Sequence, residues 1–394
     1  MTDVCVDSVA RQGVSGGWPA VAVVAAGTFT AVTSEMLPVG LLTPVGAGLG
    51  ISDGRAGSAL TITGVLAMTA PLVPVVWGRV DRRVVLCVML GVVAVGNLLS
   101  AVAPGFGTLV AGRVLIGVGM GGVWAVSGSL GARLVGAGSV GRATSVIFSG
   151  VAVASVLGVP AGTYLGSTVG WRWAFGAAAL LALGVAAAVT LVVPSLPAAR
   201  AASPRALPAL LARPSLRTGM IVVVLLVTGH FAAYTYIRPF LEQATAATAP
   251  TIGTVLLGYG IAGVAGTFTL GALAARAPRR AVLLITLTLP AAVAALALTH
   301  TLPVATTLLV VWGVAYGGVS VTSQNWTVAA APDAREAASA ILVAVFNGSI
   351  ALGALVGGGV VDGFGIRAGL WSCVGLVVAA GVVAAVGARP AATR

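Results

Sequence analysis

Two charged residues stand alone inside long apolar stretches of this chain. Glu35 lies in the string TAVTSEMLPVG, and Arg113 lies in TLVAGRVLIGVG. Burial and a neighbouring guanidinium act in opposite directions on the proton affinity of a carboxyl group, so the pair could load and release a proton. Our hypothesis is that Glu35 carries a coupling proton and that Arg113 tunes its affinity. The alternative interpretation is that Glu35 is a solvated interfacial acid and that Arg113 binds backbone carbonyls.

Polar and aromatic side chains recur inside the apolar stretches of both halves of the chain. In such surroundings they either bond to a neighbouring helix or line a wet cavity. A cavity with these groups would suit a small ring-bearing polar solute, through stacking and hydrogen bonding. For any single one of them, packing between helices is the alternative. The candidate cavity residues are Trp124, Ser127, His230, Tyr234, Tyr236, Gln324, Asn325, Trp326 and Asn347.

The residue inventory excludes several kinds of chemistry. The chain has no lysine, so it has neither a phosphate-binding P-loop lysine nor a Schiff-base lysine. His230 and His300 are its only histidines, which excludes the paired-histidine metal helix. The three cysteines have no ligand spacing. We therefore expect no enzyme activity, no cofactor and no metal site.

The composition is that of a protein embedded in a lipid bilayer. Of the 394 residues, 58% are hydrophobic and 8% are charged, whereas soluble domains carry about 25% charged residues. Twenty-one arginines against nine acids could suggest nucleic-acid binding. However, there is no polar domain on which a basic binding face could form. Nucleic acid is therefore excluded as a partner.

Apolar stretches of bilayer length divide the chain into twelve expected membrane-spanning helices, each of roughly 20 residues. The expected spans are 18–42, 55–77, 83–103, 106–131, 140–166, 171–193, 217–240, 250–275, 280–300, 303–330, 336–361 and 366–388. They predict two six-helix bundles separated by a proline- and arginine-rich linker. The expected parts of the chain are a tail at 1–17, a bundle at 18–193, a linker at 194–216, a bundle at 217–388 and a tail at 389–394.

The arginines predict the orientation of these spans. With both termini in the cytoplasm, sixteen arginines lie on the cytoplasmic side, and only Arg55, Arg172, Arg238 and Arg367 lie outside. Arg113 lies within a span. Because positive residues accumulate on the cytoplasmic side, this ratio favours a multi-pass protein of the plasma (inner) membrane with both ends inside.

An internal duplication relates the two halves at an offset near 197 residues. GRVDRRVVL at 78–86 resembles ARAPRRAVL at 275–283, and GVGMGGVWAVS at 117–127 resembles GVAYGGVSVTS at 313–323. Parallel repeats of this kind are typical of transporters that rock two bundles around a midplane site, although a duplicated structural protein is an alternative. In the second half Glu35 corresponds to Ile237 and Arg113 to Leu309. The two charges thus occur in one half only, which favours a functional role for them.

From about Trp18 to Ala388 the chain resembles the major facilitator superfamily, within it the twelve-span drug:proton antiporter branch. The resemblance rests on a loop between spans 2 and 3, which in the family helps to lock the cytoplasmic gate, and on an antiporter motif in span 5. The gate motif comprises Gly78, Asp81, Arg82 and Arg83, shortened and without the family's internal glycine. The antiporter motif comprises Gly150, Gly158, Pro160 and Gly162.

The resemblance implies the major facilitator fold, an all-α membrane protein of two pseudo-symmetric six-helix bundles. It also implies proton-coupled solute efflux by alternating access. In the family spans 1, 4, 7 and 10 line the central cavity, and the span 4 arginine, here Arg113, is implicated in proton transfer. GGVWAVSGSL at 121–130 and TYIRP at 235–239 resemble purine-nucleoside exporters of this branch. We expect a monomer whose partners are protons and a small solute, purine ribonucleosides first. The alternatives are a sugar, antibiotic or multidrug exporter, or a facilitator without proton coupling.

Overall fold

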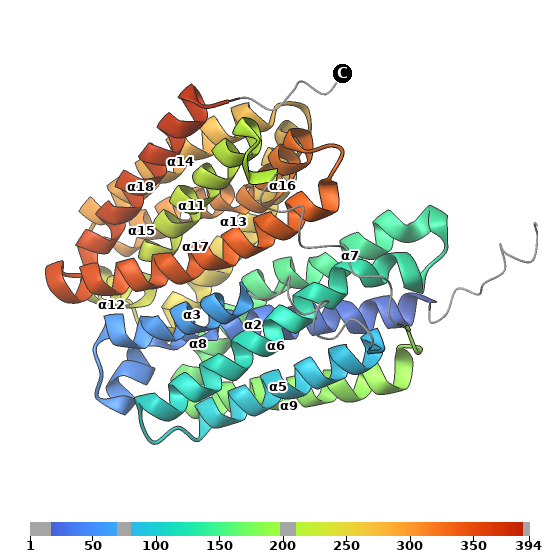
Figure 1. The fold of residues 1–394 in the computed structure, drawn as a ribbon. Coiled ribbons are helices and arrows are strands. Elements are labelled where there is room, and N and C mark those ends of the chain that lie inside the picture. The colour runs from blue at the N-terminus through green and yellow to red at the C-terminus, as the bar shows by residue number, and fades with distance from the viewer. Residues whose placement is uncertain (1–16, 69–79, 198–209, 389–394) are drawn as a thin grey trace, which may run out of the picture.

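The computed structural model of the chain describes residues 17–68, 80–197 and 210–388, and in these residues the regular structure is entirely helical (Figure 1). The first half comprises α2 (Gly17–Leu49), α3 (Asp53–Ala67), α5 (Arg82–Ala101), α6 (Phe106–Leu134), the short turn η2 (Ala137–Ser139), α7 (Val140–Val153), the π-helical turn η3 (Ala154–Gly158), α8 (Val159–Thr168) and α9 (Trp171–Val192). The second half comprises α11 (Pro214–Tyr234), α12 (Ile237–Thr245), α13 (Ala249–Arg276), α14 (Pro278–Leu298), α15 (Leu302–Gly317), α16 (Val319–Ala330), α17 (Arg335–Phe364) and α18 (Ile366–Val386).

The described residues include eleven helices that are long and apolar enough to cross a membrane. They match eleven of the twelve expected spans. The remaining one, expected at 55–77, begins as α3, and its last nine residues lie outside the described part of the chain. The tails at 1–16 and 389–394 and the linker segment 198–209 also lie outside it.

The two halves form two bundles that pack against each other along one side (Figure 1). We call α2 to α9 the N-terminal bundle and α11 to α18 the C-terminal bundle. Inside the first, α5 packs between α6 and α9; inside the second, α11 packs against α17 and α18. The bundles meet mainly where α3 lies along α17 and where α8 lies along α13.

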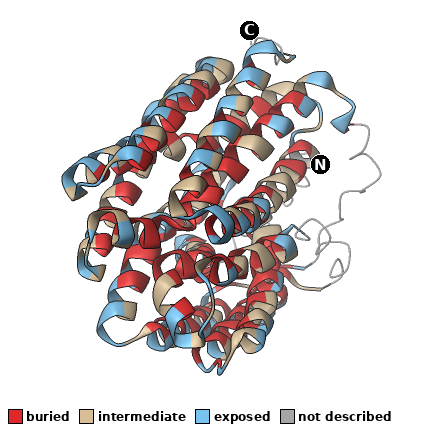
Figure 2. Cartoon of the chain, turned by 90° about the vertical axis from the view of Figure 1, so that its left-hand side faces the viewer, coloured by how far each residue is buried: buried red, intermediate tan, exposed pale blue. Residues whose placement is uncertain are grey.

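The outer surface of the bundles is suited to lipid. Figure 2 shows exposed residues along the outward faces of the helices and buried residues between them. Many of the exposed side chains are large and apolar, among them Leu191, Phe268 and Leu287. A bilayer solvates such side chains, and the helices satisfy their own backbone hydrogen bonds, so the molecule is a multi-span membrane protein.

An arginine at the start of the third helix of each half binds a carbonyl near the end of the last helix of that half, although the two arginines stand one position apart in the alignment of the halves. A guanidinium N–H of Arg83, at the start of α5, donates to the carbonyl of Thr190 near the end of α9. In the second half Arg279, at the start of α14, donates through Nε to the carbonyl of Ala384 in α18 at 3.0 Å. This shared contact accords with the duplication in the sequence.

Three expected spans are interrupted, and each interruption has a local cause. The span at 217–240 breaks after Tyr234, because Pro239 cannot donate the helical hydrogen bond to Thr235. The span at 140–166 contains the π-helical turn η3, which ends just before Pro160. The span at 303–330 breaks at Gly318, where the α15–α16 junction packs against α13. The helical period alone does not show such breaks.

Candidate functional site

The first long helix, α2, exposes two backbone carbonyls because it contains two prolines. Pro38 and Pro44 both lie inside this helix. Proline has no N–H, so the carbonyl four residues earlier has no helical donor. The affected oxygens belong to Ser34 and Gly40. Ser34 is fully buried, so its carbonyl needs another donor.

Arg113, which is completely buried on α6, supplies that donor. Its Nη1 donates to the Ser34 carbonyl at 2.9 Å, and its Nη2 donates to the Glu35 carbonyl at 2.8 Å. Its Nε donates to the hydroxyl of Thr63 on α3 at 3.0 Å. The Arg113 guanidinium on α6 therefore binds uncharged acceptors on α2 and α3. Contacts of this kind are what the alternative interpretation, in which Arg113 binds backbone carbonyls, predicts.

The Glu35 side chain lies one residue beyond the Ser34 carbonyl and is buried as well, with 2% exposed. Its Oε1 has no hydrogen-bond partner among the described residues. No ion pair joins its carboxyl group to Arg113, which binds the backbone of Glu35 instead. A guanidinium carries five N–H groups, and the contacts above use three, so two remain available to a second acceptor.

A second polar contact holds the same stretch of α2. The side-chain amide of Asn97 on α5 donates to the hydroxyl of Ser34 at 2.8 Å, and both residues are fully buried. Asn97 and Arg113 together fix Ser34 from two neighbouring helices. The backbone next to Glu35 is thus bonded to both α5 and α6, whereas Oε1 of its carboxyl group has no bonding partner among the described residues.

The C-terminal bundle contains a stack of four aromatic rings. Tyr259 stacks on Tyr234 with centroids 4.8 Å apart, and Tyr234 stacks on His230 at 5.0 Å. His230 in turn lies face to face with Tyr316, with centroids 3.3 Å apart and an interplanar angle of 8°. Trp312 stands edge-on to three of these rings. Helices α11, α13 and α15 each contribute to this stack.

A hydrogen bond assigns the protonation state of His230. The indole N–H of Trp312 donates to Nδ1 of His230 at 3.1 Å. Because an indole nitrogen can only donate, Nδ1 must carry a free lone pair, and the ring proton of a neutral imidazole then lies on Nε2. This contact accounts for His230 as a packed, neutral member of the stack.

The stack and the Glu35 segment lie in one continuous core that crosses between the bundles. Val32 and Met36, which flank Glu35 on α2, belong to the same buried cluster as Tyr234 and Tyr259. Trp124 from α6 and Tyr316 from α15 pack against this cluster and are only half-buried. The aromatic stack of the C-terminal bundle and the segment of α2 that carries Glu35 therefore belong to one buried core.

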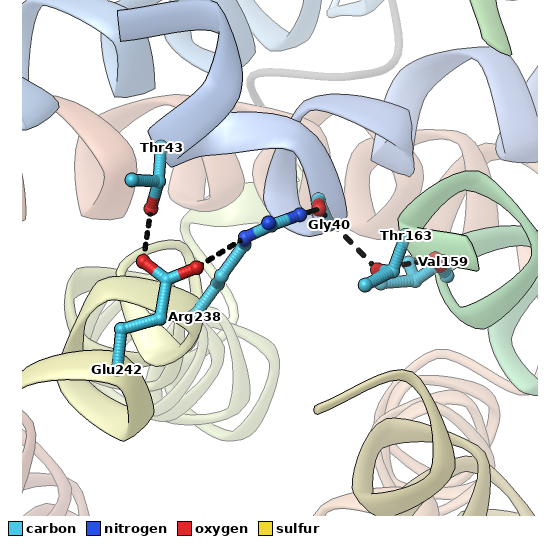
Figure 3. Close-up of polar contacts among 6 residues, drawn as sticks. All are labelled: Gly40, Thr43, Val159, Thr163, Arg238 and Glu242. Atoms are coloured by element: carbon cyan, nitrogen blue, oxygen red, sulfur yellow. Dashed lines mark hydrogen bonds and ion pairs between the residues drawn. The ribbon is translucent and has the colours of Figure 1, made fainter. Parts of the chain in front are cut away.

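The bundles are joined at one end, which we call the closed end. It holds the last turns of α2 and α17, the first turn of α3, and α12, and in Figure 1 it lies at the left. Arg238 donates through Nε to Glu242 at 2.9 Å, and the hydroxyl of Thr43 donates to the other Glu242 oxygen at 2.7 Å (Figure 3). A second guanidinium N–H of Arg238 donates to the Gly40 carbonyl, the one exposed by Pro44.

Asp362, near the end of α17, makes a second junction at the closed end. Its Oδ2 accepts from the hydroxyl of Ser52 at 2.7 Å, and its Oδ1 accepts from the backbone N–H of Gly54 at 3.0 Å. A carboxylate from one bundle thus contacts the first turn of a helix in the other, where negative charge is favoured. Burial, and then the nearby charges of Glu242 and Asp362, raise the pKa of Asp53 beside it.

The gate motif contacts the end of the N-terminal bundle opposite to the closed end. Asp81 caps α5 by accepting from the Arg83 N–H at 2.8 Å, and it also accepts from the Leu196 N–H at 3.0 Å. Burial by itself raises the pKa of Asp81, but these bonds, that from Ser195 and the charge of Arg133 outweigh it and lower the pKa. Arg82 donates its backbone N–H to Leu196 at 2.9 Å. Gly78 lies outside the described residues.

The residues of the antiporter motif form the contact between the π-interrupted helix and α2. Gly150 lies against Ala25 and Thr28, Gly158 against Thr33, and Gly162 against Leu37. A Cβ at Gly150 would collide with the Ala25 carbonyl, and one at Gly158 or Gly162 would press on a side chain of α2, so glycines at this spacing let the two helices approach closely. Pro160 follows the π-helical turn, whose residues Ser155 and Val156 meet Gly260 of α13 across the bundle boundary.

The remaining candidate cavity residues lie in several different places. The hydroxyl of Ser127 and the indole N–H of Trp124 are buried polar groups of α6 without a hydrogen-bond partner among the described residues. Tyr236 lies at the closed end, where its hydroxyl donates to the Ala354 carbonyl at 2.7 Å. Asn347 lies in α17 where it crosses α3, and its side chain bonds its own helix.

Three further candidates lie in α16, toward the other end of the C-terminal bundle. Gln324 donates to Ser339 on α17 at 2.7 Å. Trp326 donates to the Ser215 carbonyl at 3.0 Å and packs on Gly219. Asn325 is half-buried beside them. For Gln324 and Trp326 the structure thus shows contacts between helices.

Sequence reasoning missed five residues that the structure brings into these sites: Tyr259, Trp312, Tyr316, Glu242 and Asp362. The first three are isolated aromatics in apolar spans, and the other two lie one or two residues beyond the ends of the expected spans 217–240 and 336–361. The prolines of α2 were a readable signal, because each marks a free carbonyl four residues earlier. No group of three potential metal ligands is present in the described part of the chain.

Comparison with known proteins gives a consistent result. The family model described as Major Facilitator Superfamily matches residues 24–244 and 219–393. The purine ribonucleoside efflux pump NepI of Salmonella enteritidis is 35% identical over 392 residues, covering 98% of this chain and 97% of that protein. NepI of Salmonella typhimurium is also 35% identical, over 94% of this chain and 93% of that one.

Solved structures show the same fold at low identity. A nucleoside transporter, NupG, superposes with a TM-score of 0.78 at 14% identity, covering 93% of this chain and 98% of that one. A bacterial homologue of the human lysosomal transporter Spinster, in an inward-facing and occupied conformation, gives a TM-score of 0.75 at 15% identity, covering 93% and 95%. These likenesses confirm the predicted all-α fold.

Proposed function

The chain belongs to the Major Facilitator Superfamily, and from this premise we propose that it exports a small solute in exchange for protons. It is a multi-pass membrane transporter and not an enzyme. The observation that carries the proposal is the Glu35 carboxyl group, which is buried on α2 with Oε1 unpartnered. A buried carboxylate without partners is costly, so such a group tends to bind a proton or a ligand.

Arg113 supports this assignment by its position. Its fork fixes the Glu35 backbone and brings positive charge close to the carboxyl group without neutralising it in an ion pair. A rearrangement of α2 relative to α6 would change the distance between the two charges. The proton affinity of Glu35 would change with it, as coupling requires.

Alternating access would proceed by opening the closed end. With both termini in the cytoplasm, as the arginine count favours, the closed end faces the outside. The junctions of Arg238 and Asp362 would then form the outer gate, and releasing them would expose the solute to the exterior. The Asp81 motif would stabilise the opposite end.

For the solute we propose purine ribonucleosides or related compounds. NepI, a purine ribonucleoside efflux pump by name, is 35% identical to this chain over 98% of its length. The aromatic stack, which shares a buried core with the α2 residues that flank Glu35, offers flat faces that suit a heteroaromatic base. One proton crossing 100 mV carries about 2.3 kcal/mol, which supports roughly a 50-fold solute gradient at 1.4 kcal/mol per tenfold.

Inverted membrane vesicles test both the direction and the solute. With an acidic lumen, we expect labelled inosine or adenosine to enter and the lumenal pH to rise as it does. Ribose, an aromatic antibiotic and an empty-vector membrane serve as comparisons. Uptake of inosine that continues unchanged with a protonophore would support a facilitator instead. If only ribose or the antibiotic is taken up, the protein is still an exporter, but the proposed nucleoside substrate is wrong.

A further inference from the structure

Asp53 and Asp362 belong to different bundles and meet at the closed end. Asp362 of α17 accepts hydrogen bonds from Ser52 and from Gly54, the two residues that flank Asp53 in the chain. The contact is tight, because Oδ2 of Asp362 leaves no room for a Cβ at Gly54. The charge of Asp362 acts on Asp53 at this contact. The two carboxyl groups are therefore neighbours only while the bundles are joined.

Glu242 adds a third carboxyl group to this junction. It lies on α12 and accepts from the hydroxyl of Thr43 on α2 (Figure 3). Oδ1 of Asp53 faces the same helix about one turn later, 3.7 Å from the position that a Cβ at Gly46 would take. Arg238 pairs with Glu242, whereas no ion pair among the described residues includes either of the two aspartates. Negative charge therefore accumulates at the junction when the end is closed.

The other charged and titratable groups of the surrounding helices do not compensate Asp53. Arg55, on α3 itself, holds its guanidinium over an aromatic ring of α6, 4.8 Å from the centroid. Arg113 of α6 binds α3 farther along its length. The hydroxyl of Tyr236 on α12 donates to a carbonyl of α17. Glu35 of α2 lies about three turns away from the contact with Asp53.

The proton affinity of Asp53 depends on whether the end is closed. Burial, and then the charges of Glu242 and Asp362, raise the pKa of Asp53 in the closed arrangement. Opening would expose Asp53 to water and move it away from both carboxylates, which removes these causes. The first turn of α3 favours negative charge, but it does so in both arrangements. A group that binds its proton more tightly in one arrangement favours that arrangement as the pH falls.

We propose that Asp53 is the proton sensor of the outer gate, so that a proton bound from the exterior favours the closed arrangement. The inference rests on the proposed function only for the side of the membrane that the closed end faces. Asp53 then has a different task from Glu35: it sets the position of the gate, whereas Glu35 carries the coupling proton. In an exchanger of this kind, an acidic exterior closes the gate after the solute has left.

The test measures the opening of the closed end as a function of pH. Spin labels at Gly107→Cys and Gly363→Cys, with the native cysteines replaced, report the distance between the bundles in nanodiscs. The parent protein carries Glu35→Gln, so that the coupling carboxyl group cannot titrate. We expect the open fraction of this parent to decrease as the pH falls from neutral toward 3.8, the ordinary pKa of an aspartate such as Asp53.

Three variants of this parent assign the effect to Asp53. Asp53→Asn should abolish the pH dependence and give the small open fraction already at neutral pH, because an amide carries no charge. Asp333→Asn is the matched control, since Asp333 bonds Arg213 and not the other bundle, and it should titrate like the parent. Glu242→Gln removes one of the two charges that act on Asp53 and should shift the transition to lower pH.

The outcomes separate this inference from the proposed function. An Asp53→Asn protein whose open fraction varies with pH as in the parent would overturn the inference, and so would a parent without pH dependence. Both results leave the exporter standing, because its test is proton and solute movement with Glu35 intact. A protein that moves neither protons nor nucleoside would refute the exporter and leave the gate measurement valid. Should Asp53→Asn fail to fold, as judged by its melting temperature, an unshifted transition in Glu242→Gln would overturn the inference.

Discussion

Pro38 and Arg113 act on the same oxygen atom. The proline leaves the carbonyl of Ser34 without a helical donor, and the guanidinium supplies one at 2.9 Å from another helix. Pro44 and Arg238 repeat the relationship at the closed end, where the freed carbonyl is that of Gly40. One helix thus offers two backbone acceptors, one inside the N-terminal bundle and one between the bundles.

A double-mutant cycle should detect the relationship between Pro38 and Arg113. Arg113→Lys replaces a fork with a point charge and should lower stability by about 2 kcal/mol, since hydrogen bonds between membrane helices contribute roughly 0.6–1.7 kcal/mol each. In a Pro38→Ala background the new N–H satisfies Ser34, so Arg113→Lys should cost about 0.6 kcal/mol less. Thermal unfolding in detergent measures all four proteins. Strictly additive effects would contradict the shared acceptor.

Removing the Asp362 carboxylate should open the closed end. Asp362→Ala abolishes two charge-assisted bonds between the bundles and should shift the equilibrium by about 1–3 kcal/mol toward separation. Spin labels at Gly107→Cys and Gly363→Cys, where a side chain meets nothing, would report a longer distance. The native cysteines would first be replaced.

Asp333→Ala is the control for this experiment. Asp333 also holds two hydrogen bonds, from Arg213, but this pair links the residue just before α11 to the connection between α16 and α17 and does not join the two bundles. Its removal should leave the label distance unchanged. Equal distances in the Asp362→Ala protein and the wild type would show that this junction does not hold the bundles together.

The Arg213–Asp333 pair should give a distinct acid dependence. Hydrogen bonds from Arg213 lower the pKa of Asp333 from 3.8 to about 2. Because this folded-state pKa is depressed, the pair stabilises the protein above pH 3.8, and that stabilisation is lost as the pH falls through about 2. The melting-temperature difference between wild type and Asp333→Asn should therefore shrink over this range. The Arg213 and Asp333 side chains are 38% and 62% exposed, so 1 M salt should shrink the difference too. A difference that grows toward acid pH would be the opposite of this expectation.

The sequence predicted the fold because the bilayer imposes a simple rule on length and polarity. Apolar runs located the spans, and eleven of them are present in the described residues. Interruptions within spans were harder, although Pro239 and Pro160 mark two of them directly. Helix period and hydropathy show which faces of a segment are apolar. A break such as that after Tyr234 depends instead on a single backbone N–H that proline lacks.

The candidate site was only partly visible in the sequence. Glu35 and Arg113 stood out as charges in apolar runs, but the contact of Arg113 with backbone carbonyls depends on how three helices approach. The stack of Tyr316 on His230 likewise joins two helices whose rotations the sequence does not specify. Gln324 and Trp326 looked equally suited to a cavity, yet they bond neighbouring helices instead.

The measurement that tests the central claim most directly compares proton and solute movement in Glu35→Gln and wild type. Both proteins are reconstituted into proteoliposomes with a pH-sensitive dye and labelled inosine. The account predicts that Glu35→Gln still exchanges inosine for inosine across the membrane, but that it no longer moves protons with inosine or accumulates it along a pH gradient. Proton movement in Glu35→Gln equal to that of the wild type would contradict the account.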